Sequence, residues 1–120
     1  MTNSREKGAA AEREVARILR EYGYDARRGQ QYCGANGDAD IVGLEGLHIE
    51  VKRRESFQLY NAMAQAKHDA REGEIPVVFH RRNNCPWVVI LSLEDFMRMY
   101  QDYEPPVPFA DLEGEGDGES

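Results

Sequence analysis

Cysteine is scarce in this sequence, because Cys33 and Cys85 are the only two among 120 residues and form no CxxC pair. This count excludes a disulfide framework and a thiolate zinc site as organising features. The three histidines show no spacing typical of zinc ligands. No apolar run approaches the roughly 18 residues that cross a bilayer, and the charged first twenty residues lack the apolar core of a secretory signal. We therefore expect a cytoplasmic protein without a membrane partner.

Basic residues are also few for a protein that binds nucleic acid. The chain has 15 lysines and arginines against 22 aspartates and glutamates, a net charge of -7, whereas phosphate contacts normally call for a basic surplus. Five acidic residues, however, lie in the last ten positions, and all basic residues lie between Arg5 and Arg98. Without that acidic end the balance is 15 against 17, or -2. The composition argues against a protein that binds nucleic acid but does not exclude one.

Periodicity and turn residues predict the elements of the fold. Apolar residues recur at helical spacing before the stop signal Gly23 and again before a predicted C-terminal cap at Gly73. Strand-like runs on both sides of Glu45-Gly46 have the length and composition of a hairpin with a two-residue turn. Ser92 with Asp95 resembles a helix-capping pair. Helices are expected at 4–22, 57–72 and 92–100, and strands at 25–28, 40–44, 47–52, 75–80 and 87–91.

This order, αβββαββα, predicts an α/β fold in which helices flank a mixed five-stranded sheet. We expect the fold to occupy residues 1–103 as one domain. Residues 104–120 are acidic and rich in proline and glycine, so they cannot bury enough apolar surface to order themselves. They are expected to form a flexible tail. The turn-rich run 29–37 is expected to be a loop.

One predicted hairpin carries a group of charged side chains. Side chains alternate between the faces of a strand, so His48, Glu50 and Lys52 share the face opposite Leu47, Ile49 and Val51. Asp40 opens the neighbouring strand, and its carboxylate can approach that of Glu50 across the ladder. Converging carboxylates repel each other unless a divalent cation binds them, and such hard oxygen ligands suit Mg²⁺ or Mn²⁺. The pattern predicts a metal site.

Two further charged residues extend this site. Lys52 can orient an attacking water or stabilise negative charge that builds on a phosphoryl group. A solvated strand face with an ordinary ion pair is the alternative, because charges are common on strands. Glu12 lies at the edge of the apolar face of the first helix, where an acidic side chain needs a partner. It either reaches solvent, pairs with a nearby arginine, or joins Asp40.

These segments together resemble the PD-(D/E)XK nucleases. Within them the chain looks most like the archaeal-type Holliday-junction resolvases and their phage relatives, over about residues 5–100. The resemblance implies a restriction-endonuclease-like fold, the catalytic residues Glu12, Asp40, Glu50 and Lys52, and Mg²⁺ bound by the three carboxylates, with Mn²⁺ as a substitute. It rests on Lys7-Gly-Ala-Ala-Ala-Glu12-Arg13-Glu14, on Asp40-Ile-Val and on Ile49-Glu50-Val51-Lys52.

The sequence also departs from that family pattern. Ala39 stands where a proline usually precedes the first aspartate, which removes a turn constraint but no ligand. The run 29–34 lacks the serine that resolvases often carry there, which weakens the junction assignment more than the nuclease assignment. Asp38 could compete for the role of Asp40, although the spacing to Ile41-Val42 favours Asp40.

Several polar residues are candidates for contacts outside the metal site. Gln65 lies off the apolar face of the second helix, where related nucleases often place a glutamine near the active site. Basic residues at strand ends and turns suit phosphate contacts. Solvated side chains are the alternative in both cases. The DNA-binding candidates are Lys7, Arg27, Arg28, Arg53 and Arg54.

The function expected from these residues and the resemblance is metal-dependent hydrolysis of DNA phosphodiester bonds, with a role in DNA recombination as a four-way-junction resolvase. The alternatives are another structure-specific or non-specific nuclease of this fold, a catalytically weak DNA-binding module, and an adaptor that uses its acidic tail. An adaptor function would leave the Glu50–Lys52 pattern unexplained.

A resolvase with one active site per chain needs two copies to cut two strands, so the expected assembly is a homodimer on branched DNA. Apolar residues of the last strand and helix offer contact surface for the second copy, or they simply cover the sheet. These residues are Trp87, Phe96, Met97, Met99, Tyr100 and Tyr103.

Overall fold

The computed structural model describes residues 4–30 and 39–107. Its five strands form one sheet in the order β1-β2-β3-β4-β5. β3 and β4 run parallel, and the other neighbouring strands run antiparallel, so the predicted mixed sheet is confirmed. The elements are α1 (Ser4–Glu21), β1 (Arg27–Arg28), β2 (Ile41–Val42), β3 (Leu47–Arg53), α2 (Leu59–Asp69), β4 (Ile75–Arg81), β5 (Val88–Ile90) and α3 (Leu93–Tyr100).

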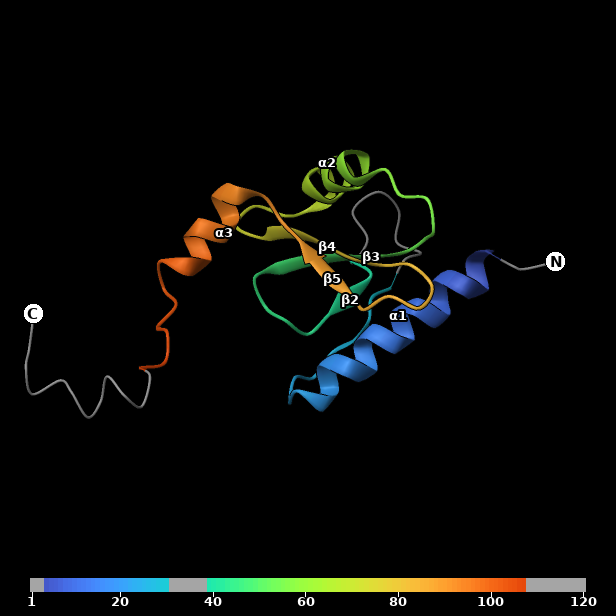
Figure 1. Cartoon of the computed structure of the whole chain (residues 1–120), viewed down its shortest axis with the longest axis horizontal. Coiled ribbons are helices and arrows are strands. Elements are labelled where there is room, and N and C mark those ends of the chain that lie inside the picture. Colours follow the sequence, from blue (N-terminus) through green and yellow to red (C-terminus); the bar gives the residue numbers. More distant parts are fainter. Residues whose placement is uncertain (1–3, 31–38, 108–120) are drawn as a thin grey trace, which may run out of the picture.

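Helices α1 and α2 cover opposite faces of the sheet (Figure 1). The apolar face of α1 buries Val15 against Ile49 and Val51 of β3, in the larger of two hydrophobic clusters. α2 buries Ala62 and Ala66 against Val78 of β4 in the smaller cluster. Cross-strand partners share a face, and Val78 is the partner of Glu50. Glu50 therefore points to the α2 side of the sheet, as do His48 and Lys52.

Two glycines fix turns that join these layers. Gly23 has a φ of 102° and donates its N–H to the carbonyl of Arg20 (2.9 Å), so it ends α1 as its position in the sequence predicts. Gly43 has a φ of 116°, and a Cβ there would lie 2.4 Å from the carbonyl oxygen of Asp25. Only glycine allows the chain after β2 to pass this close to the chain before β1.

The hairpin of β2 and β3 is confirmed, although its turn is longer than the predicted Glu45-Gly46. β2 contains only Ile41 and Val42, and residues 43–46 connect it to β3. Ile41 pairs with Ile49 in antiparallel register. Asp40 therefore precedes the strand instead of opening it. Most of the predicted loop 29–37, together with Asp38, lies outside the described residues.

The predicted second helix, 57–72, is too long at both ends. α2 ends at Asp69 because the backbone of Ala70 is extended, with a ψ of 144°. Gly73 is not its C-terminal cap. With a φ of 89°, it lies in a separate turn in which the N–H of Glu74 donates to the carbonyl of Arg71 (3.0 Å). This turn reverses the chain so that β4 can lie parallel to β3.

Helix α3 begins as predicted, because the Oγ of Ser92 accepts a hydrogen bond from the N–H of Asp95 (3.0 Å). None of the residues of α3 is buried, and the helix projects from the body of the domain (Figure 1). Trp87, by contrast, packs against the larger cluster and donates its Nε1–H to Glu14 Oε2 (3.2 Å). Among the described helices, none has the length and apolar character needed to span a bilayer.

Candidate active site

Asp40 is held at the edge of β3 by two hydrogen bonds. Its N–H donates to the carbonyl of Ile49 (3.0 Å), and its Oδ2 accepts from the N–H of Val51 (2.8 Å). The side chain thus takes the place of a main-chain carbonyl that a longer β2 would have offered to Val51. The residue is only 9% exposed, so this short strand delivers a buried carboxylate beside Glu50.

The electrostatics of Asp40 show how crowded the site is with negative charge. Burial is the largest cause and repulsion from Glu50 the second, and together they raise the pKa of Asp40 from 3.8 to about 7. The Val51 N–H opposes this rise by stabilising the carboxylate, while the charge of Glu12 and a hydrogen bond with Glu50 add to it. Without a cation, burial and repulsion therefore favour the protonated form of the Asp40 carboxyl group. A bound cation can replace that proton.

For Glu12, the structure combines two of the three surroundings that the sequence left open, an arginine partner and proximity to Asp40. Its Oε1 accepts from Arg28 Nε (2.9 Å), and its side chain is only 13% exposed. Its negative charge also contributes to the raised pKa of Asp40. Glu12 therefore lies between an arginine of β1 and the carboxylate pair of the hairpin.

Lys52 lies beside Glu50 on the same face of β3, two residues along the strand. No ion pair of its ammonium group occurs within the described part of the chain. It lines a pocket of about 280 Å³ together with Arg54, Asn61 and Gln65. Gln65, from α2, thus lines the same pocket as Lys52.

The five DNA-binding candidates do not form one cluster. Lys7 is exposed on the early part of α1, and Arg27 is exposed on β1 at 3.9 Å from Asp25. Arg28 is paired with Glu12, and Arg54 lines the Lys52 pocket. Arg53 follows Lys52 and so points to the other face of the sheet, where its Nη2 donates to Asn83 Oδ1 (2.8 Å).

His48 contacts Glu50 directly, although the sequence pattern assigned it no role. Its Nε2 lies 2.7 Å from Glu50 Oε2, and the residue is 4% exposed. Ligand atoms of His48, Glu50 and Asp69 all lie within 4.8 Å of one another. The alternation of side chains along β3 was the available signal for the contact with Glu50, since residues two apart on a strand are neighbours. The position of Asp69, at the end of α2, carried no such signal.

The donor set fits a hard divalent cation. Glu12, Asp40 and Glu50 supply carboxylate oxygens, and the charges of Glu50 and Glu12 both contribute to the raised pKa of Asp40, so the three groups lie near one another. Oxygen ligands of this kind suit Mg²⁺ or Mn²⁺ better than softer metals. His48 adds a nitrogen next to the set, but it is already engaged with Glu50.

Comparisons with known proteins bear on the fold and on the family of the chain. No curated protein sequence matches the chain. Among solved structures, the chain is similar to Hjc of Archaeoglobus fulgidus, a Holliday junction resolvase from an archaeal hyperthermophile, with 28% identity and a TM-score of 0.54. That match covers 71% of this chain and 72% of the resolvase, and it confirms the predicted fold.

The sequence also matches the family described as "Phage putative PDDEXK endonuclease" over residues 3–114. The match includes all four predicted catalytic residues, from Glu12 to Lys52. Because it spans nearly the whole chain, the protein belongs to this family of PD-(D/E)XK endonucleases.

Proposed function

We propose that this protein is a Mg²⁺-dependent endonuclease that hydrolyses phosphodiester bonds of branched DNA, with four-way junctions as its preferred substrate. The observation that carries the proposal is the convergence of Asp40, Glu50 and Glu12 beside Lys52. Clustered acids that raise the pKa of Asp40 destabilise a domain that only binds DNA. A nuclease gains a cation site from the same arrangement.

Each residue of the site then has a chemical task. Asp40, Glu50 and Glu12 would hold the cation, which would supply Lewis acidity to offset the charge that builds on the scissile phosphate. Lys52 presents its ammonium two residues beyond Glu50, where it orients the attacking water or offsets charge in the transition state. Gln65 and Arg54 line the neighbouring pocket and position the phosphate backbone.

Similarity to the Archaeoglobus resolvase supports the choice of a four-way junction over other substrates. A junction must be cut in two strands related by approximate two-fold symmetry. The proposed assembly is therefore a homodimer with one metal site per copy. Within it, residues 1–103 form the nuclease domain and residues 104–120 an acidic tail.

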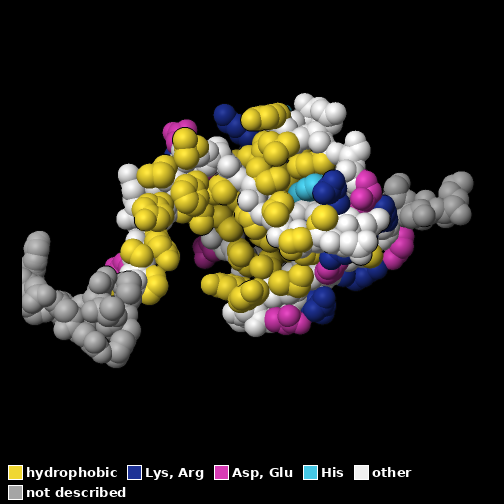
Figure 2. Space-filling view, viewed as in Figure 1, with side chains coloured by type: hydrophobic (Ala, Val, Ile, Leu, Met, Phe, Trp, Pro, Cys, Tyr) yellow, Lys and Arg dark blue, Asp and Glu magenta, His cyan; other side chains and the backbone are white. Residues whose placement is uncertain are grey.

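The surface around α3 supports this assembly. A groove of about 460 Å³ lies between sheet residues such as Val77 and Phe79 and the apolar side of α3, including Phe96, Met99 and Tyr100. Figure 2 shows hydrophobic side chains gathered along α3 and toward the centre of that face. An eight-residue helix is marginal in water without tertiary packing. A second copy with the same patch provides that packing.

The test is cleavage of a panel of labelled DNAs by the purified protein, with Mg²⁺ and with EDTA. We expect Mg²⁺-dependent cutting, with four-way junctions cut faster than flaps, nicks or plain duplex. Equal rates on all substrates would indicate a non-specific nuclease. Binding without cutting would instead indicate a DNA-binding module.

Light scattering at micromolar concentration, with and without junction DNA, tests the assembly. A dimeric mass is expected in both conditions. A protein that stays monomeric in both would exclude the resolvase mechanism and leave the metal site unaffected.

A further inference from the structure

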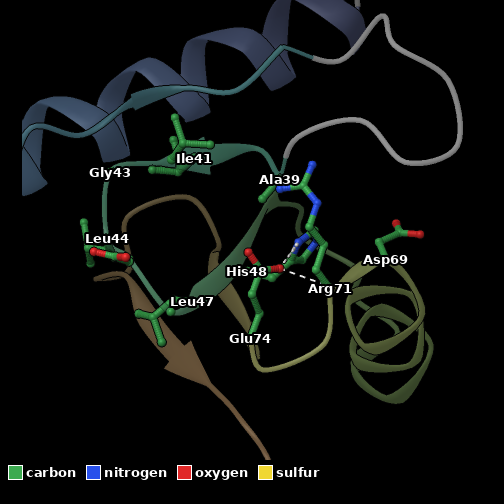
Figure 3. Close-up of a pocket in the computed structure, with 12 residues that line it drawn as sticks. Ala39, Ile41, Gly43, Leu44, Leu47, His48, Asp69, Arg71 and Glu74 are labelled. Atoms are coloured by element: carbon green, nitrogen blue, oxygen red, sulfur yellow. Dashed lines mark hydrogen bonds and ion pairs between the residues drawn. The ribbon is translucent and has the colours of Figure 1, made fainter.

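His48 lies buried between two carboxylates outside the predicted catalytic set. Its Nε2 is 2.7 Å from Glu50 Oε2, and its Nδ1 is 3.8 Å from Glu74 Oε1. Figure 3 shows Glu74 pointing toward the imidazole from the turn between α2 and β4. Burying a polar ring costs folding free energy unless its nitrogens have polar partners. Here both nitrogens of His48 face a carboxylate oxygen.

The direction of the first hydrogen bond follows from its partners. An ionised carboxylate can only accept, so Nε2 must carry the hydrogen and donate it to Glu50 Oε2. This contact restrains rotation of the Glu50 carboxylate. It engages one oxygen on the His48 side and leaves Oε1 as the oxygen that can serve the site shared with Asp40.

The fold holds the imidazole firmly enough for such a task. His48 is on a central strand that pairs with neighbours on both sides, and it is 4% exposed. The turn that carries Glu74 is closed by a hydrogen bond from the N–H of Arg71 to Glu74 Oε1 (2.8 Å). The same oxygen therefore faces His48 and fixes the turn, which limits how far the ring can move.

We propose that His48 is a positioning residue: it donates to Glu50 and orients that carboxylate toward the metal site, with Glu74 supporting the ring from behind. The inference rests on the proposed function, because it takes Glu50 as a metal ligand. Residues that orient metal ligands typically contribute about ten- to hundredfold to metal affinity or activity. Nothing in the sequence motif requires a histidine for this task, so the contact belongs to this chain's own geometry.

Two amide substitutions separate the hydrogen bond from general packing. In His48→Gln the amide nitrogen can reach the position of Nε2, whereas in His48→Asn the shorter side chain cannot. We expect H48N to weaken Mn²⁺ affinity in calorimetry by about tenfold, and H48Q to stay within about threefold of wild type. His68→Asn, at a histidine whose side chain is 85% exposed, is the matched control and should leave the affinity unchanged.

Kinetics add a second readout. With H48N, the Mg²⁺ concentration that gives half-maximal cleavage should rise by about tenfold, while the rate at saturating Mg²⁺ recovers. Equal Mn²⁺ affinity in H48N, H48Q and wild type would overturn the inference and leave the proposed function intact. A wild-type protein that neither binds Mn²⁺ nor cleaves DNA would instead overturn the proposed function and the inference with it.

Long-range ¹H–¹⁵N spectra of the metal-free wild type test the hydrogen bond without any variant. The His48 ring should show a hydrogen on Nε2 at neutral pH. An unprotonated Nε2 would contradict the proposal, even if neither amide variant folds.

Discussion

Asp40→Asn should stabilise the metal-free protein and at the same time remove its response to metal. A pKa of about 7 in the folded chain, against an ordinary value of 3.8, means that folding favours the protonated carboxyl. The metal-free protein should therefore lose stability as the pH rises between these two values. Asparagine can still accept from the Val51 N–H, and it carries no charge to repel Glu50.

The size of the effect follows from the same values. Full ionisation of Asp40 corresponds to a destabilisation of about 4 kcal/mol. Because Glu50 can share the proton and relieve part of this cost, we expect Asp40→Asn to gain about 2 kcal/mol near pH 7. This gain corresponds to a rise of roughly 10 °C in Tm for a domain of this size. Near pH 4 the two proteins should be almost equally stable.

Thermal and urea unfolding with EDTA across this pH range measure the difference. His48 adds a second pH dependence, because hydrogen bonding to Glu50 raises its pKa above the ordinary 6.5. The stability that it contributes is lost only as the pH rises beyond that value, so the range from about pH 4 to pH 6.5 reports mainly on Asp40. Asp25→Asn is the matched control, since the Asp25 side chain is 96% exposed.

Magnesium should reverse the ranking. At 100 times its Kd, an ion that binds only the folded state stabilises the wild type by about 2.7 kcal/mol, and Asp40→Asn should show little of this gain. Parallel stability curves for the two proteins, with and without Mg²⁺, would refute the conclusion that the crowding of Asp40 and Glu50 is relieved by a cation.

Three further results are expected. Glu50→Ala and Lys52→Ala should lower the single-turnover cleavage rate by about 100- to 1000-fold while the fold and DNA binding stay largely intact. The control Lys67→Ala, at an exposed lysine of α2, should leave the rate unchanged. Near-normal cleavage rates in Glu50→Ala or Lys52→Ala would contradict the proposed mechanism. Phe96→Glu should give a monomer by light scattering with a small change in Tm, because Phe96 is 47% exposed in a single chain. Truncation after Ala110 should tighten DNA binding at low salt if the acidic tail occupies a basic surface, and unchanged affinity would limit the tail to a role in solubility.

The element order and the hairpin could be predicted from sequence because each rests on a local pattern. Strand alternation placed Glu50 and Lys52 on one face, and the capping pair at Ser92 marked the start of α3. The predicted end of the second helix was wrong because the helical pattern of the sequence continues past the point where the backbone turns. Gly73 serves the turn that leads into β4, a need set by parallel pairing with a distant strand.

The contacts of the site depended on tertiary structure and could be predicted only in part. Periodicity indicated that Glu12 needed a partner, yet it could not choose between Arg28 and Asp40, and the folded chain supplies both. His48 and Glu74 lie 26 positions apart in the sequence, and their approach depends on the parallel pairing of β3 with β4. The exposed apolar side of α3 likewise became visible only once its place relative to the sheet was known.

Asp40 combines a structural task with a costly charge, and this combination argues for a cation. The Val51 N–H needs an acceptor because β2 is too short to supply one, and its bond to Oδ2 satisfies that need. An asparagine would accept the same hydrogen bond without repelling Glu50 or Glu12. The local structure alone would therefore be more stable with an amide at this position. A carboxylate in a site this crowded has a physical rationale once a divalent ion is bound, because only then does its negative charge contribute favourably to the folded state.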